Sequence, residues 1–100
     1  MLEINTVAEG NTTVVYLTGR LDVKAAKDAD TAFAEAADEA KDVILDLADL
    51  DYIASAGLRA LKRLRDAVRK NGNSLVVRNV QENVMEVLEM TGFAAMLTFG

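Results

Sequence analysis

Apolar and polar residues alternate near the start of the chain in the way that is typical of β-strands. The alternation runs from Leu2 to Val7, and apolar residues return from Val14 to Leu17. Between them, Glu9-Gly10-Asn11 has residue types that favour a tight turn. The pattern predicts two strands joined as an antiparallel hairpin, the second of which ends at Thr18-Gly19.

The segment from Val23 to about Ala40 has the spacing of an amphipathic helix. Its apolar residues recur three or four positions apart, and most of the charged residues fall on the other side. Asp22 is placed to cap the helix at its start. The inner face is narrow and rich in alanine, with Ala26, Ala29, Phe33, Ala36, Ala37 and Ala40.

The same order of strand and helix follows in the middle of the chain. The apolar run from Val43 to Leu47 is typical of a strand covered on both faces. Residues 48–53 are expected to form a loop. A second amphipathic helix, ending near Gly72, is predicted from the spacing of Leu58, Leu61, Leu64 and Val68.

The last quarter of the chain contains one more strand and one more helix. Residues 74–78 are a strand candidate, and Asn79 with Glu82 resembles a capping box that leads into a short helix. Gly92-Phe93 is expected to end this helix, with Phe93 folding back. Residues 96–99 are a candidate for a last short strand.

The order of elements is therefore β-β-α-β-α-β-α, with a possible closing strand. Strand-helix-strand units imply parallel pairing through right-handed crossovers, and the amphipathic helices must bury their apolar faces on the sheet. Because 100 residues with 51% hydrophobic content suffice for one core but not for two, residues 1–100 are expected to be a single α/β domain.

Composition excludes several functions. The net charge of −5 disfavours binding to nucleic acid or to an anionic membrane. The chain has no cysteine, so it has no disulfide and no thiolate zinc site. The acidic start differs from a secretory signal, and no apolar run approaches the ~20 residues of a membrane span. We expect a soluble protein, which fits a cytoplasmic location.

The chain also lacks histidine. This excludes a Ser-His-Asp triad and the usual histidine metal ligands, so we expect that the protein is not an enzyme and needs no cofactor. Loop carboxylates could gather at one end of the sheet, but their spacing does not resemble a calcium loop, and turns or caps are their commoner role. These carboxylates are Asp22, Asp46, Asp49 and Asp51. We expect that they bind no metal ion.

The second helix carries many basic residues between Arg59 and Lys70, with Asp66 as the single acidic interruption. No exposed aromatic residues are interleaved with them, so we interpret them as a solvated face and not as a nucleic-acid site. This face could still meet an acidic patch on a protein partner.

Ser55, in the stretch YIASAGL, stands where the chain enters the second helix. It could cap this helix through its hydroxyl, or it could accept a phosphoryl group from a kinase. Its neighbours Ala54 and Ala56 are small. Gly57 costs about 1 kcal/mol within a helix, which either close approach of a partner or tight packing against the loop at Asp22 would explain. A phosphate would be tolerated at a helix N-terminus.

Three segments, LTGRLD at 17–22, VILDLADLDYIASAGLRAL at 43–61 and NVQENVMEVLEMTGF at 79–93, resemble the STAS domain. They are most similar to the bacterial anti-sigma factor antagonists. The resemblance implies a sheet that is parallel except for its N-terminal strand, with helices packed mainly on one face. It also implies a cytoplasmic regulator of transcription that frees a sigma factor by binding an anti-sigma factor serine kinase.

In that family the kinase phosphorylates one serine at the start of the second helix, which abolishes binding, and a serine phosphatase restores it. The usual motif is Asp-Ser-Ser-Gly or Asp-Ser-Thr-Gly, and its acceptor corresponds to Ser55. Asp22 matches an acidic position beside the acceptor. Ala54 departs from the usual Asp or Ser, whereas Ala56 is common in relatives with Ser-Ser-Ala-Gly.

The leading hypothesis is a phosphorylation-switched protein-binding module without a small-molecule substrate. Its acceptor would be Ser55, and its partner surface would include Asp22, Asp49, Tyr52, Ala54, Ala56, Gly57 and Arg59. The alternative is a constitutive docking subunit of a lipid transporter or of a stress-sensing assembly, in which Ser55 is only a cap. A phospho-aspartate receiver is disfavoured, because LEINTV and MLTFG lack its acidic pair and its lysine.

Overall fold

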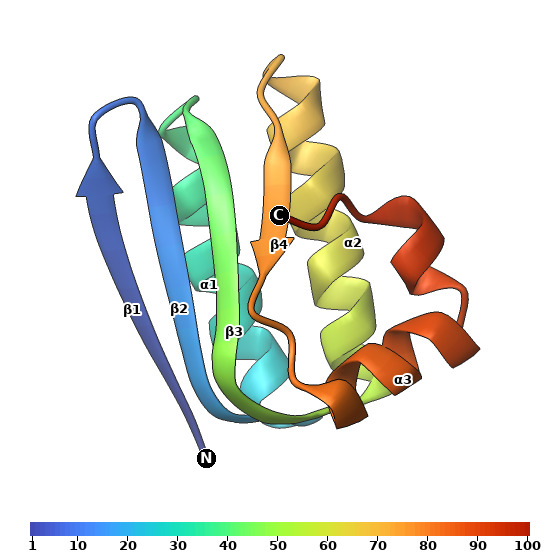
Figure 1. Ribbon diagram of the computed structural model, residues 1–100. Coiled ribbons are helices and arrows are strands. Elements are labelled where there is room, and N and C mark those ends of the chain that lie inside the picture. Colours follow the sequence, from blue (N-terminus) through green and yellow to red (C-terminus); the bar gives the residue numbers. More distant parts are fainter.

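A four-stranded mixed sheet forms the centre of the computed structural model, which describes residues 1–100. The strands are β1 (Leu2–Glu9), β2 (Thr12–Leu21), β3 (Asp42–Ile53) and β4 (Leu75–Arg78), and they lie in this order across the sheet (Figure 1). β1 is antiparallel to β2, and the other neighbours are parallel. The predicted mixed sheet with an N-terminal antiparallel hairpin is confirmed.

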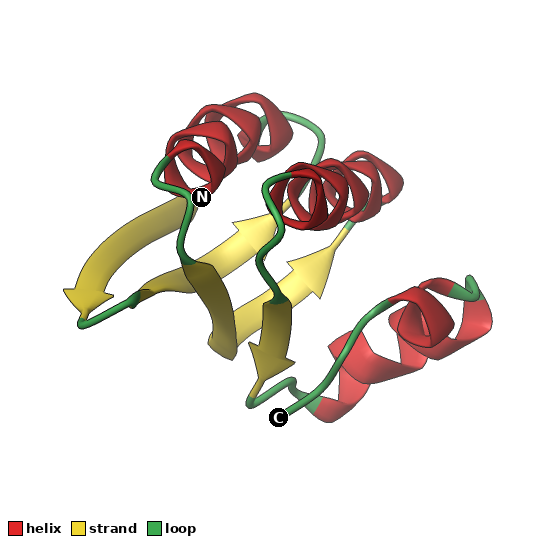
Figure 2. Cartoon of the chain, turned by 90° about the horizontal axis from the view of Figure 1, so that it is seen from above, coloured by secondary structure: helices red, strands yellow, loops and turns green.

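Three α-helices accompany the sheet: α1 (Ala25–Asp38), α2 (Ser55–Lys70) and α3 (Glu82–Met90). α1 and α2 lie side by side on one face, whereas α3 lies beside the β4 edge (Figure 2). A short 3₁₀ helix, η1 (Phe93–Met96), follows α3. No helix combines the length and the apolar character needed to cross a membrane.

The core lies between the sheet and the layer of α1 and α2. Alternate strand residues such as Val15, Leu45 and Val77 are paired across the sheet and fully buried against this layer. Phe33 of α1 and Leu61 of α2 pack into the same cluster. The period of two in the strands and the spacing of three or four in the helices therefore produce one continuous apolar layer.

The hairpin turn consists of two residues, Gly10 and Asn11, because Glu9 pairs directly with Thr12. Gly10 has φ +59°, which glycine adopts without a steric penalty. The predicted end of the second strand at Thr18-Gly19 is wrong, since β2 continues to Leu21.

The predicted loop at residues 48–53 is also wrong, because β3 runs unbroken through Ile53. The ladder between β2 and β3 shifts register twice, between Tyr16 and Thr18 and between Gly19 and Arg20. These irregularities place buried β3 side chains three positions apart, at Leu47, Leu50 and Ile53. A strand with bulges does not show the period of two, so the sequence pattern concealed it.

Several helix boundaries differ from the predictions. α1 begins at Ala25, and Ala40 lies beyond its end with φ +55°. Asp22 Oδ1 accepts the Ala25 N–H at 2.9 Å, as its predicted capping role requires, although the residue directly before α1 is Lys24, whose side chain makes no capping hydrogen bond. The helix stop at Gly92 is confirmed as well, with φ +82° and Phe93 packed against the core.

Two predictions for the last quarter of the chain are wrong. Asn79 does not form a capping box, because it has φ +57°, its amide binds a carboxylate on β3, and Gln81 is the N-cap of α3. Residues 96–99 do not form a strand. Met96 is the last residue of η1, and the three residues after it make one parallel bridge, between Val77 and Phe99.

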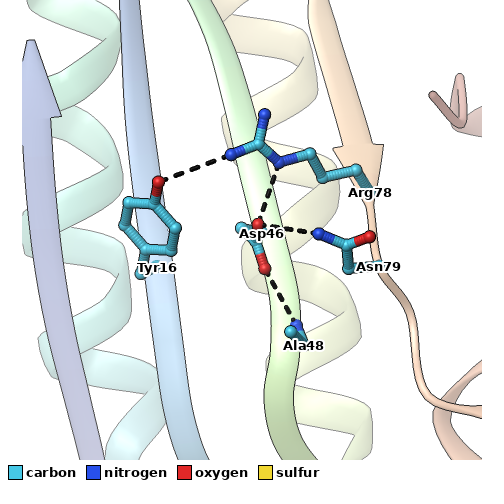
Figure 3. A network of polar contacts seen from close by, with 5 residues as sticks. All are labelled: Tyr16, Asp46, Ala48, Arg78 and Asn79. Atoms are coloured by element: carbon cyan, nitrogen blue, oxygen red, sulfur yellow. Dashed lines mark hydrogen bonds and ion pairs between the residues drawn. The ribbon is translucent and has the colours of Figure 1, made fainter.

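Asp46 is the centre of a polar network on the sheet face opposite α1 and α2 (Figure 3). Its Oδ1 accepts the Ala48 N–H at 3.0 Å, and its Oδ2 accepts Arg78 Nε at 2.9 Å and Asn79 Nδ2 at 3.0 Å. Arg78 also donates to the Tyr16 hydroxyl at 3.4 Å. The network therefore joins β2, β3 and β4 to the turn that leads into α3.

Asp46 is only 6% exposed, and this burial acts to raise its pKa. The hydrogen bonds from Ala48, Arg78 and Asn79 outweigh burial, and the net pKa lies below the usual value. The ionised carboxylate therefore stabilises the fold above the pKa of the unfolded chain, about 4, and this contribution is lost as the pH falls through the lower folded pKa.

We expect Asp46→Asn to lower the free energy of unfolding at pH 7 by about 1–3 kcal/mol, because one side-chain oxygen that accepts two donors is replaced. Urea denaturation at pH 7 and pH 3 is the measurement. The difference between wild type and variant should shrink at pH 3, because this pH lies below the unfolded-chain pKa of about 4 and the unfolded wild-type chain then gains a proton. Equal differences at the two pH values would contradict this role for the ionised group.

Candidate functional site

The ends of β2 and β3 meet the start of α2 at one end of the sheet. Leu21 and Ile53 are the last paired residues, and the Ala54 N–H donates to the Leu21 carbonyl oxygen at 2.9 Å. Asp22 and Ser55 directly follow the two residues of this hydrogen bond. The fold therefore brings together two candidate residues that are 33 positions apart in the sequence.

Ser55 is exposed and is the first residue of α2. The N-cap is Ala54, with extended backbone angles of φ −96° and ψ 171°, and its carbonyl oxygen accepts the Leu58 N–H at 3.0 Å. The interpretation of Ser55 as the helix cap is therefore wrong. The chain leaves its extended conformation one residue earlier than expected, and no side chain caps this helix.

The first turn of α2 is electrostatically suited to an anion. The first helical hydrogen bond belongs to Leu58, so the N–H groups of residues 55–57 have no acceptor within the helix. The turn contains no acidic residue. These N–H groups and the helix dipole give the surface around Ser55 a partial positive charge.

Gly57 is buried, and its lack of a side chain has a direct structural reason. A Cβ at this position would lie 2.7 Å from Leu21 Cγ, 2.9 Å from the Leu21 carbonyl oxygen and 3.0 Å from Ile53 Cγ1. Of the two explanations that the sequence left open, tight packing is therefore the one observed. Gly57 seats the start of α2 on the ends of β2 and β3.

Asp22 is half-buried, and the hydrogen bond from the Ala25 N–H holds its pKa below the usual value. The nearby charges of the chain N-terminus and Arg20 act in the same direction. Asp22 is therefore ionised at neutral pH. It places a fixed negative charge at the end of β2, next to the start of α1.

The remaining candidates lie on the second half of β3 and at the start of α2. Tyr52 is 41% exposed, and its ring lies under the Arg20 guanidinium at 4.3 Å from the centroid. Asp49 is exposed and pairs with Thr18 across the ladder. Arg59 is exposed one helical turn after Ser55, on the same helix face. The flanking residues Ala54 and Ala56 are half-buried.

Two surface residues of this region were missed by sequence reasoning. Arg20 covers Tyr52, which becomes evident only from the pairing of these two residues in the ladder. Val23 is 71% exposed beside Asp22, whereas the sequence pattern placed it at the start of the helix. An apolar residue directly after a capping Asp is the one signal that could have suggested its exposure.

No group of three or more acidic side chains is arranged to hold a metal ion.

The mixed sheet, with β1 antiparallel and two helices side by side on one face, defines an α/β domain of the STAS class. The sequence pattern of the STAS domain matches residues 3–100. The chain therefore belongs to the STAS domain family.

A named relative of the chain belongs to the anti-sigma factor antagonists. BtrV of Bordetella bronchiseptica, named as a candidate member of that group, is 43% identical over 51 residues. This match covers 51% of the chain and 44% of BtrV, so it spans less than half of that relative.

Solved structures share the fold at low sequence identity. A candidate anti-sigma factor antagonist from Thermotoga maritima has a TM-score of 0.86 and 17% identity, with 96% of this chain and 84% of that chain covered. Unphosphorylated SpoIIAA, also an anti-sigma factor antagonist, has a TM-score of 0.74 and 14% identity over 100% and 87% of the two chains. SpoIIAA of Bacillus in its phosphorylated form has a TM-score of 0.73 and 15% identity, with 100% and 91% covered.

We expect Gly57→Ala to destabilise the protein by about 1–3 kcal/mol, since the added methyl group would overlap Leu21. Urea denaturation is the measurement, with Ala56→Gly, which should cost about 0.5–1 kcal/mol of helix stability, as a neighbouring control. In an unobstructed helix, glycine to alanine would stabilise by about 1 kcal/mol. A gain of that size at position 57 would contradict the packing described above.

Proposed function

We propose that this protein is an anti-sigma factor antagonist that binds an anti-sigma factor serine kinase while Ser55 is unmodified, and thereby frees a sigma factor. The observation that carries the proposal is the position of Ser55. Ser55 is exposed at the start of α2, which no side chain caps. A hydrogen bond joins the preceding residue, Ala54, to Leu21, and Asp22 directly follows Leu21.

Phosphorylation would act on the partner surface and not on the fold. The kinase would transfer the γ-phosphoryl group of ATP to the Ser55 oxygen, with loss of the hydroxyl proton and release of ADP. The phosphate adds about −1.5 to −2 charges at a helix end that favours an anion, so the domain tolerates it. A partner packed on Ser55 would have to accommodate its bulk and bury its charge.

The surface proposed to bind the partner combines a fixed negative charge with apolar area. Asp22 and Asp49 supply carboxylates, Tyr52 and Val23 supply exposed apolar groups, and Arg59 adds a cation one turn after Ser55. A mixture of this kind is typical of protein interfaces that form and separate. The small side chains of Ala54 and Ala56 would leave the Ser55 hydroxyl accessible to a kinase.

The wider setting follows from the family. We propose that residues 1–100 act as one STAS domain in the cytoplasm, that the ATP site belongs to the kinase, and that a separate serine phosphatase hydrolyses the phosphoserine. Relatives named as anti-sigma factor antagonists support the role, and the phosphorylated form of SpoIIAA is a precedent for a modified protein of this fold.

Incubation with ATP and the anti-sigma kinase of the same organism should add a single phosphate to the wild-type protein, detected as a gain of one phosphoryl group in intact mass. Ser55→Ala should take up none, because its acceptor oxygen is gone. Ser74→Ala is the matched control, since Ser74 is the other serine of the chain and is also exposed. Equal uptake by wild type and Ser55→Ala would contradict the assignment of Ser55.

The binding consequence is tested separately with Ser55→Glu, in which a carboxylate imitates part of the phosphate charge. We expect its affinity for the kinase, measured by calorimetry, to fall on the order of tenfold or more, because a new charge would be buried at the interface without a partner. Undiminished binding would instead favour the constitutive docking role, in which Ser55 takes no part.

Asp22→Asn should weaken binding to the anti-sigma kinase, because it removes the fixed charge beside Ser55 but leaves an amide oxygen that can still accept the Ala25 N–H. Calorimetric titration measures the affinity. Asp28→Asn is the control, as it removes an exposed carboxylate from the first turn of the same helix. Equal effects of the two changes would indicate general electrostatics and not a specific contact at Asp22.

A further inference from the structure

A cavity of about 400 Å³ lies near the opposite end of α2 from Ser55. Its walls are the last two turns of α2, the turn that leads to the first residue of β4, the end of η1 and the segment that follows η1. That segment is held back along β4 by hydrogen bonds from the Val77 N–H to Thr98, at 2.8 Å, and from the Gly100 N–H to Val77, at 3.0 Å (Figure 1). Two parts of the chain that are distant in sequence, residues 65–75 and 95–98, therefore build this cavity.

The charged residues that line the cavity are both arginines, Arg65 and Arg69. They stand four positions apart on α2, so their side chains leave the same helix face with Cβ atoms about 6 Å from each other. Arg69 takes part in none of the four ion pairs of the chain, and Arg65 has one contact, with Asp66 at 3.1 Å. Arg69 is therefore available to a ligand, and Arg65 retains donors beyond its contact with Asp66.

No carboxylate lines the cavity, although the whole chain has a net charge of −5. Asp66, the nearest acid on α2, already binds Lys62 at 2.9 Å as well as Arg65. Asp42 does not line the cavity, and its Oδ1 already accepts the Ser74 N–H at 3.0 Å and Asn73 Nδ2 at 3.4 Å. A concave site with two guanidinium groups and low-dielectric walls concentrates positive potential, which is the condition for binding an anion.

The rest of the lining indicates what kind of anion would fit. The hydroxyl groups of Ser74 and Thr98 can supply hydrogen bonds, and Leu75, Met96 and Leu97 form an apolar wall. Guanidinium groups bind phosphate and carboxylate oxygens through paired hydrogen bonds. We infer that this cavity binds a small organic oxyanion, whose charged end lies between Arg65 and Arg69 and whose carbon body rests against Leu75 and Leu97.

The first test is titration of the isotope-labelled protein with phenyl phosphate and, in a second series, with benzoate, followed by amide chemical shifts. The two probes distinguish a phosphate from a carboxylate as the preferred end group. We expect saturable shifts at residues 73–75 and 95–98 with at least one probe. Absence of saturable shifts at these residues with both probes would overturn the inference.

The second test separates a built site from general attraction to a basic helix. Arg69→Gln should weaken binding of the better probe by on the order of tenfold, because it removes a charge-assisted pair of hydrogen bonds. Lys70→Gln removes the same charge from the adjacent residue, which does not line the cavity, and should change the affinity less than about twofold. Equal losses in both variants would overturn the inference.

Ser74→Glu provides an independent variant on another wall. Ser74 is exposed, so a longer side chain can be accommodated there, and the new carboxylate would compete for the arginines. We expect this variant to lose probe binding while its amide spectrum outside the cavity remains that of the folded protein. Binding at wild-type affinity in a folded Ser74→Glu protein would count against this cavity as the site.

Discussion

The long parallel pairing between β2 and β3 organises most of the molecule. It continues past two register shifts to Leu21 and Ile53, and the hydrogen bond from Ala54 to Leu21 extends the connection into α2. Gly57 then allows α2 to rest directly on these strand ends. Because the start of α2 is held to the end of β2, Ser55 and Asp22 occupy one surface, and the proposed switch requires no other part of the chain to bring them together.

The two ends of α2 have different electrostatic character. We propose that the start accepts a phosphate on Ser55 and that the other end binds a small oxyanion. The start has unpaired N–H groups and no acidic residue, which favours an added phosphate on Ser55. The other end carries Arg69 and Lys70, which complement the negative end of the helix dipole, and Arg69 also lines the cavity. One helix can therefore serve a partner surface and a small-anion site, which lie in its first and last turns.

The Asp46 network has a structural role that complements the apolar core. The core fills one side of the sheet, whereas Asp46, Arg78 and Tyr16 join neighbouring strands on the other side. The bond from Asn79 to Asp46 also fixes the turn before α3, where Asn79 adopts a positive φ. A buried carboxylate with three donors holds this turn in place of the capping box that residues 79 and 82 suggested.

Local signals in the sequence predicted most of the helices and strands. The hairpin, the three helices, the cap at Asp22 and the stop at Gly92 follow from spacing and turn chemistry, because those signals depend on neighbours within a few positions. The mapping of Ser55 as a phosphoacceptor candidate came from the resemblance to the family. Four features became evident from the three-dimensional structure alone: residues 48–53 are a strand, Ala54 and not Ser55 is the cap, position 57 is glycine because of its packing, and Arg65 and Arg69 face a cavity. Each of these depends on a contact between segments distant in sequence, and the bulges in β3 remove the period of two that would have revealed its strand locally.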